Sequence, residues 1–113
     1  MLSRMISTHV LDLGLGVPAQ GISVRLEKKS GSGSWSVIGE ELTDADGRIR
    51  YASKAESGSY RLTFQIDKYF SKQNSGAPFL TEAVVAFQIE KTDRKYHIPL
   101  LLSPYGFSTY RGS

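Results

Sequence analysis

Apolar side chains alternate with polar ones along much of this chain, and this period of two constrains the fold more than any other feature. Between residues 60 and 66 every second residue is apolar, and the same alternation occurs in residues 22–26, 83–89 and 96–102. Successive side chains of a strand point to opposite faces, so each segment predicts a half-buried strand. Shorter strands are expected at residues 5–12, 35–42, 49–51 and 105–110.

Turn-forming residues separate these segments. Clusters of Gly, Ser, Asn, Asp and Pro occur at residues 14–21, 30–34, 45–48, 56–58 and 74–78. Only residues 67–73 favour a helix, with Asp67 placed to cap it and with Tyr69 and Phe70 directed inward. The pattern predicts an all-β fold, a β-sandwich of about eight strands with one short helix. At 113 residues the chain is expected to form a single domain, residues 1–113.

Composition excludes several classes of function. The chain has no cysteine, so disulfides and thiolate chemistry are excluded. Its net charge of +3 comes from scattered Lys and Arg residues, which do not predict nucleic-acid binding. No apolar run approaches the ~20 residues that span a bilayer, so no membrane partner is expected. Residues 1–5 lack the apolar segment of a secretory signal, so we expect a cytoplasmic protein, or a periplasmic one if a signal preceded residue 1.

Three apparent ligand motifs predict only turns or surface residues. The spacing of Gly14, Gly16 and Ala19 fits a loosened dinucleotide fingerprint, but a strand rather than a helix is expected after it. Residues 44–47 resemble the start of a calcium loop and lack its later ligands, which indicates a tight turn. Two histidines 88 positions apart form no local metal motif. The residues alone therefore contain no recognisable motif for a metal or an organic cofactor.

Both histidines fall on the polar face of a predicted strand. His97 points away from the apolar face of residues 96–102, on the same side as Lys95 and Pro99, and therefore lies on the outer face of its sheet. His9 is likewise offset from the apolar residues of its strand and shares a face with Ser7 and Leu11. The simplest interpretation is two surface histidines, but both lie on strands rather than in loops, where polar residues usually occur.

The last four residues bring several reactive groups together. Tyr110, Arg111, Gly112 and Ser113 directly follow the last predicted strand. They supply a phenol, a guanidinium and a hydroxyl within one short segment. Terminal residues are ordinarily a ragged polar tail, and this composition is more typical of part of an active site.

Taken together, these segments resemble a known family. Residues 7–12, the turn at 46–48 and residues 96–113 are similar to the 5-hydroxyisourate hydrolases of the transthyretin-related family. The block Leu-Leu-Ser-Pro-Tyr at 101–105 is common to these enzymes and to the transthyretins, so it indicates the fold. His9, Arg48, His97 and the terminal Tyr-Arg-Gly-Ser resemble the enzyme signature, which hormone-carrying transthyretins lack.

The resemblance implies an assembly and a reaction. The expected fold is a transthyretin-like sandwich, and the expected assembly is a homotetramer, a dimer of dimers with active sites in a channel between the dimers. The implied substrate is the small molecule 5-hydroxyisourate. Its cyclic amide would be hydrolysed to give 2-oxo-4-hydroxy-4-carboxy-5-ureidoimidazoline after rearrangement, a step of urate degradation that needs no cofactor.

The resemblance also implies a role for each site residue. His9, Arg48, His97 and Ser113 are the expected catalytic residues, and His9, Arg48, Tyr110 and Arg111 the expected substrate-binding residues. A neutral imidazole can accept a proton from water, and Arg48 can stabilise the developing anion. Ser113 is suited to hold the water or to relay a proton. Which histidine is the base stays open, with His9 the first choice and His97 orienting water and substrate.

Two other classes of function are consistent with a β-sandwich. One is a non-enzymatic, transthyretin-like carrier of a small aromatic ligand. The other is an extracellular sandwich domain that serves adhesion or supports another enzyme. The histidines, Arg48 and the terminal tetrapeptide favour the enzyme over both.

Overall fold

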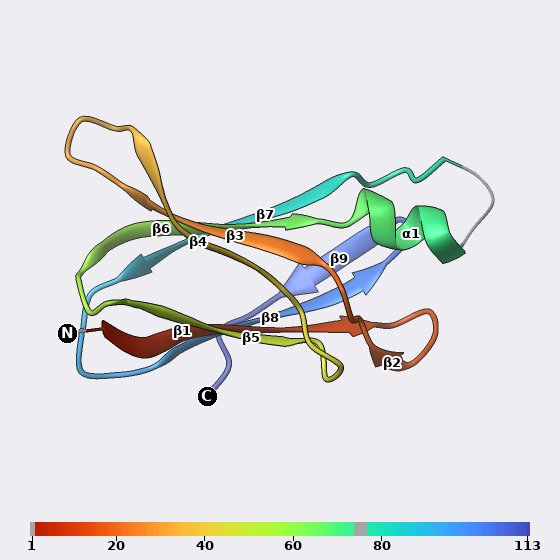
Figure 1. Cartoon of the computed structure of the whole chain (residues 1–113), viewed down its shortest axis with the longest axis horizontal. Helices are drawn as coiled ribbons and strands as arrows, with labels where there is room; N and C mark the ends of the chain where they lie inside the picture. The colour runs from red at the N-terminus through yellow and green to blue at the C-terminus, as the bar shows by residue number, and fades with distance from the viewer. Residues whose placement is uncertain (1, 74–76) are drawn as a thin grey trace.

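A computed structural model describes residues 2–73 and 77–113, and its strands form two sheets packed face to face (Figure 1). The first sheet contains β1 (Leu2–Asp12), β2 (Val17–Pro18), β5 (Arg48–Lys54), β8 (Tyr96–Ser103) and β9 (Gly106–Thr109). The second has the order β4 (Trp35–Leu42), β3 (Ser23–Lys29), β6 (Gly58–Gln65), β7 (Glu82–Ile89). One helix, α1 (Asp67–Gln73), follows β6. The predicted all-β sandwich is therefore confirmed.

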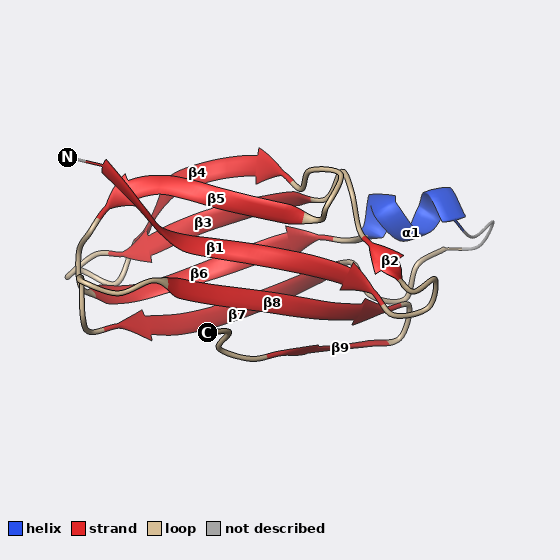
Figure 2. Ribbon diagram, turned by 90° about the horizontal axis from the view of Figure 1, so that it is seen from below, coloured by secondary structure: helices blue, strands red, loops and turns tan. Residues whose placement is uncertain are grey.

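The strand β1 lies at the centre of the first sheet, between β5 and β8 (Figure 2). It pairs in parallel with β8, so that residues 6–12 lie beside residues 96–102. On its other side it pairs antiparallel with β5, and β9 pairs antiparallel with β8. Three segments that are distant in sequence therefore lie on adjacent strands.

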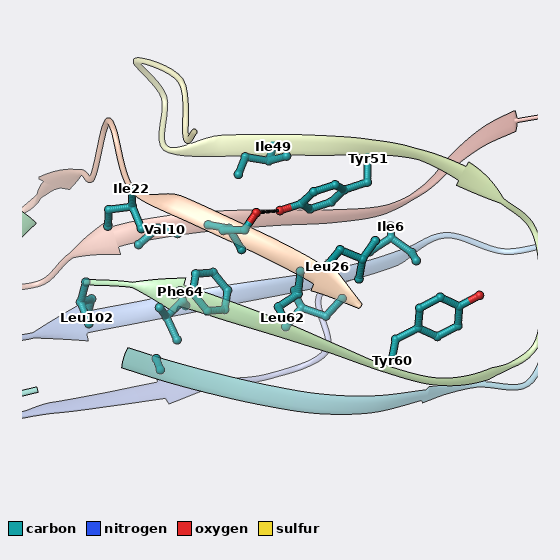
Figure 3. Packing of buried hydrophobic residues seen from close by; sticks show 14 of the residues in the cluster. Ile6, Val10, Ile22, Leu26, Ile49, Tyr51, Tyr60, Leu62, Phe64 and Leu102 are labelled. Atoms are coloured by element: carbon teal, nitrogen blue, oxygen red, sulfur yellow. Dashed lines mark hydrogen bonds between the residues drawn. The ribbon is translucent and has the colours of Figure 1, made fainter. Parts of the chain in front are cut away.

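The core consists of the inward-facing side chains of both sheets (Figure 3). The alternation read from the sequence holds, because the even-numbered residues from Tyr60 to Ile66 are all buried. Tyr51 also connects the two sheets, since its buried hydroxyl donates a hydrogen bond of 2.6 Å to the carbonyl of Val24 on β3. Burial of apolar area stabilises such a core by about 25 cal/mol per Å².

The helix closes one end of the sandwich. Phe70 is buried in the core, and Tyr69 is partly buried against it. The Tyr69 hydroxyl donates a hydrogen bond of 2.7 Å to the buried carboxylate of Asp12, which ties α1 to the end of β1. The predicted inward direction of these two aromatic residues is confirmed. No helix in the described part of the chain has the length and apolar character needed to cross a membrane.

The structure differs from the sequence prediction mainly at strand ends. The described residues contain nine strands, one more than expected, because Val17–Pro18 forms the short strand β2 inside the predicted loop 14–21. Ala19 donates a backbone hydrogen bond of 2.9 Å to Val10, which holds this segment against β1. The strands β1 and β5 are longer than predicted and β9 is shorter. Of the predicted turn 74–78, residues 74–76 lie outside the described residues.

Candidate active site

The outer face of the first sheet brings polar side chains from three strands into register. Across β5 and β1, Arg48 pairs with His9 and Arg50 pairs with Ser7. Across β1 and β8, Ser7 pairs with His97. Paired residues on adjacent strands project to the same face. One row of the sheet therefore reads Arg50, Ser7, His97, with Arg48 and His9 beside it.

A tight turn before β5 positions Arg48. One carboxylate oxygen of Asp44 accepts hydrogen bonds of 2.9 Å from the backbone N–H groups of Asp46 and Arg48. The Arg48 N–H is the main reason that the pKa of Asp44 is lowered. Gly47 has a φ of 76°, and its carbonyl accepts a 2.8 Å hydrogen bond from Val10. The expected tight turn at 44–47 is confirmed, and it fixes Arg48 to β1 next to His9.

A hollow of about 630 Å³ lies on this side of the molecule, within the usual size range of small-ligand pockets. Arg48, His97 and Ser113 all line it, together with Ser7. Its charged lining consists of five cationic side chains and one carboxylate: Arg4, Arg48, Arg50, Arg94, Lys95 and Asp93. This excess of positive charge favours an anionic ligand.

The surroundings of His97 favour its neutral imidazole form by lowering its pKa. Partial burial lowers its pKa, and the charges of His9, Arg48 and Arg50 lower it further. Its Nδ1 atom lies 2.8 Å from the hydroxyl oxygen of Ser7 and shares a hydrogen bond with it. Among the described residues, the hydrogen bonds of the ring involve Nδ1 and leave Nε2 available. A neutral imidazole with one available nitrogen can accept a proton from water or orient it.

The last residues of the chain lie against β8 beside His97 (Figure 2). The Gly112 N–H donates a hydrogen bond of 2.8 Å to the carbonyl of His97, and Ser113 then lines the charged hollow. Tyr110 and Arg111 instead line a second hollow of about 170 Å³, together with residues of β7 and β8. There the Arg111 guanidinium lies 5.2 Å from the centre of the Tyr96 ring.

The structure thus brings three of the six predicted site residues into one hollow. Arg48, His97 and Ser113 share it, whereas Tyr110 and Arg111 line the neighbouring one, which His97 also lines. His9 pairs with Arg48 and is close enough to lower the pKa of His97, but it is not among the residues that line either hollow.

Ser7 and Arg50 also line the first hollow, and they were not among the site residues predicted from the sequence. Each stands two positions from a predicted site residue, Ser7 before His9 and Arg50 after Arg48. Because side chains two positions apart on a strand point to the same face, Ser7 shares a face with His9, and Arg50 shares one with Arg48. Their role emerges only from the pairing of β5, β1 and β8, which local sequence does not specify. Among the described residues, no three His, Asp or Glu side chains come together in a group that could hold a metal ion.

The chain is similar to proteins of one family over nearly its whole length. The family model described as HIUase/Transthyretin family matches residues 6–112. A 5-hydroxyisourate hydrolase of Salmonella typhi is 45% identical over 114 residues, which cover 98% of this chain and 82% of the relative.

Two solved structures show the same likeness in three dimensions. The structure of the Klebsiella pneumoniae 5-hydroxyisourate hydrolase superposes with a TM-score of 0.81 at 32% identity, covering 98% of this chain and 100% of the other. The crystal structure of transthyretin from Sparus aurata has a TM-score of 0.89 at 28% identity, covering 97% of each chain.

Proposed function

The chain belongs to the HIUase/transthyretin family, and from this membership we propose that it hydrolyses 5-hydroxyisourate in urate degradation. The family resemblance read from the sequence is confirmed by the match over residues 6–112. The relatives also confirm that the chain is a hydrolase. We further propose that residues 1–113 form one domain of this family.

One observation supports the enzymatic site most strongly. Arg48, His97 and Ser113 come from distant parts of the chain and line the same positively charged hollow. A carrier of a small aromatic ligand needs neither a base nor a group that holds water. An enzyme that hydrolyses an amide needs a proton acceptor and a cation near the carbonyl oxygen.

In the proposed reaction, the neutral imidazole of His9 or His97 removes a proton from a water molecule. The water oxygen adds to the ring amide carbon, and Arg48 stabilises the negative charge that develops on the carbonyl oxygen. The C–N bond then breaks, the imidazolium returns the proton to the ring nitrogen, and the former carbonyl carbon stays in the opened product as a carboxylic acid, which releases its remaining proton to solvent and becomes a carboxylate. General-base catalysis typically contributes 10²–10⁴-fold, and positioning and charge stabilisation contribute the rest.

The last residues of the chain have the remaining proposed roles in the site. Ser113 lines the hollow and would hold the attacking water. Tyr110 and Arg111 are proposed to contact the substrate ring. Within one protomer they line the neighbouring hollow, so this contact requires a substrate that reaches the edge of β8.

We also propose that the protein is a homotetramer, a dimer of dimers. The proposed site lies on the outer face of a sheet, and large apolar side chains are exposed around that sheet: Leu13, Leu15, Val17, Phe107 and Tyr110. Contiguous exposed apolar surface is typical of subunit interfaces. A second dimer over this face would turn the open hollow into part of a channel.

The decay of freshly generated 5-hydroxyisourate tests the activity directly. The ultraviolet band of the compound should disappear faster with the protein than without it, at a rate proportional to protein concentration. Heat-denatured protein serves as the control. Decay at the spontaneous rate, together with binding of the compound in a fixed ratio, would instead support the carrier.

A further inference from the structure

Gly112 makes an unusually close approach to the ring of His97. A Cβ atom built at Gly112 would lie 2.6 Å from Cδ2, 3.3 Å from Cγ and 3.4 Å from Cβ of His97. Carbon atoms in proteins do not approach this closely without displacement. Gly112 is also not one of the glycines with positive φ. Its backbone conformation therefore accepts any residue, and the imidazole is what requires a glycine.

Ser7 lies at the other edge of the same ring. Its hydroxyl oxygen is 2.8 Å from Nδ1, and Nδ1 and Cδ2 are the two ring atoms bonded to Cγ. Rotating the imidazole by half a turn would exchange these two atoms, break the hydrogen bond to Ser7 and bring Nδ1 against Gly112. The hydrogen bond to Ser7 therefore selects one orientation of the ring, and the close backbone at Gly112 limits how far the ring can move away from Ser7.

We propose that Ser7 and Gly112 are positioning residues that clamp the His97 imidazole from its two edges and present Nε2 in a single orientation. This inference rests on the proposed function, in which His97 acts on water or substrate. Neither residue touches the reacting atoms, and both act through the ring. Because a displacement of about 1 Å can cost 10²-fold in rate, the clamp has a measurable kinetic consequence.

The test compares two glycines near the end of the chain. Gly112→Ala should lower kcat about 10- to 100-fold with little change in KM, because it displaces the ring of His97 and leaves the charged lining intact. Gly106→Ala is the matched control, since a Cβ atom there would meet only the Ser103 hydroxyl at 3.9 Å. Its kcat should equal that of the wild type.

Ser7 provides an independent pair of variants. Ser7→Ala removes the hydrogen bond to Nδ1 and should also lower kcat, whereas Ser7→Thr keeps a hydroxyl and should restore most of the activity. Ser36→Ala, at an exposed serine of the other sheet, is the control. In ¹⁵N NMR spectra, the ring nitrogens of His97 should shift in Gly112→Ala and Ser7→Ala, while both control variants leave them unchanged.

The NMR readout separates this inference from the proposed function. If the wild type does not accelerate 5-hydroxyisourate decay, the proposed function fails, and the ring spectra still decide on the clamp. Wild-type kcat and ring spectra in Gly112→Ala would overturn the clamp. If Gly112→Ala does not fold, Ser7→Ala decides in its place: an unchanged His97 spectrum overturns the clamp, and a changed spectrum that Ser7→Thr restores supports it.

Discussion

At the residue scale, the surroundings of His97 disfavour its charged form. Partial burial is the main cause, and the positive charges of His9, Arg48 and Arg50 add to it, so its pKa lies below the ordinary value of 6.5. In the unfolded chain the pKa of this histidine is about 6.5. The unfolded state therefore binds the proton first as the pH falls, so the stability lost through His97 builds up between pH 6.5 and its lower native pKa and stays lost below that pKa.

This shift predicts where activity is lost in acid. If neutral His97 takes part in the reaction, kcat/KM should persist as the pH falls through 6.5 and should decrease only near the lowered pKa of His97. NMR titration of the His97 ring and a pH profile of kcat/KM measure the two quantities. Arg50→Gln removes one of the positive charges and should raise the pKa of His97 toward 6.5. A native pKa at or above 6.5 would contradict the prediction.

Substitution of the three charged or titratable residues tests their catalytic roles. His9→Ala, Arg48→Ala and His97→Ala should each lower kcat/KM by at least ~10²-fold, the low end of the range for acid–base catalysis. The fold should survive, because all three side chains lie on the outer face of the sheet rather than in the core. Thermal unfolding and steady-state assays measure both effects. Loss of folding in His97→Ala, with normal activity per folded molecule, would indicate a structural histidine.

Some of these residue roles could be predicted from the sequence and others could not. The alternation along residues 96–102 already placed His97 on an outer face, and the structure confirms it. The contact between Ser7 and His97 could not be predicted, because it depends on two strands 90 residues apart pairing in parallel. Nothing in the local pattern of either strand specifies that pairing.

At the scale of elements, the turn before β5 controls where Arg48 lies. Gly47 has a φ of 76°, and a Cβ atom there would collide with the carbonyl oxygen of Val10. Gly47→Ala should therefore lower the free energy of unfolding by the cost of a left-handed alanine, about 1–2 kcal/mol, and by a further ~1–3 kcal/mol for the steric overlap. Chemical denaturation of the folded protein measures the sum.

Gly16 provides the matched control for this turn. Its φ is 72°, and a Cβ atom there would have no neighbour within 4 Å. Gly16→Ala should incur only the conformational cost, so the difference between the two variants isolates the overlap at Val10. Equal destabilisation by Gly47→Ala and Gly16→Ala would show that the turn shifts enough to relieve the overlap. The turn would then not fix Arg48 to β1.

The elements that could be predicted are those with a clear period or a clear boundary. The helix at residues 67–73 and the strand at 35–42 have the bounds expected from the sequence. The strand β2 was missed because two residues, one of them Pro18, carry no period that distinguishes a strand from a loop. In the structure Val17 pairs with Asp12 and Pro18 with Leu11 on β1. Backbone bonds from the flanking residues, Ala19 to Val10 and Gly16 to Asp12, hold the segment there.

At the scale of the whole molecule, the exposed apolar residues predict an assembly. Light scattering of the purified protein should give a mass about four times the 12.5 kDa of one chain. Leu15→Glu should shift the protein to smaller species and lower its activity, because Leu15 is 61% exposed next to the sheet that carries the site. Leu42→Glu is the control, since Leu42 is 65% exposed on the other sheet. A fully active monomer at micromolar concentration would contradict the channel proposal.

The parallel pairing of β1 with β8 also determines when the protein can work. Ser7 and His97 meet only after a loop of about 90 residues has closed, and contacts of such long range slow the folding of small proteins into the millisecond-to-second range. A chain whose second sheet has formed but whose β8 has not yet docked contains ordered strands and no site. Recovery of turnover during refolding would therefore report the docking of β8 on β1, whereas circular dichroism reports strands formed anywhere in the chain.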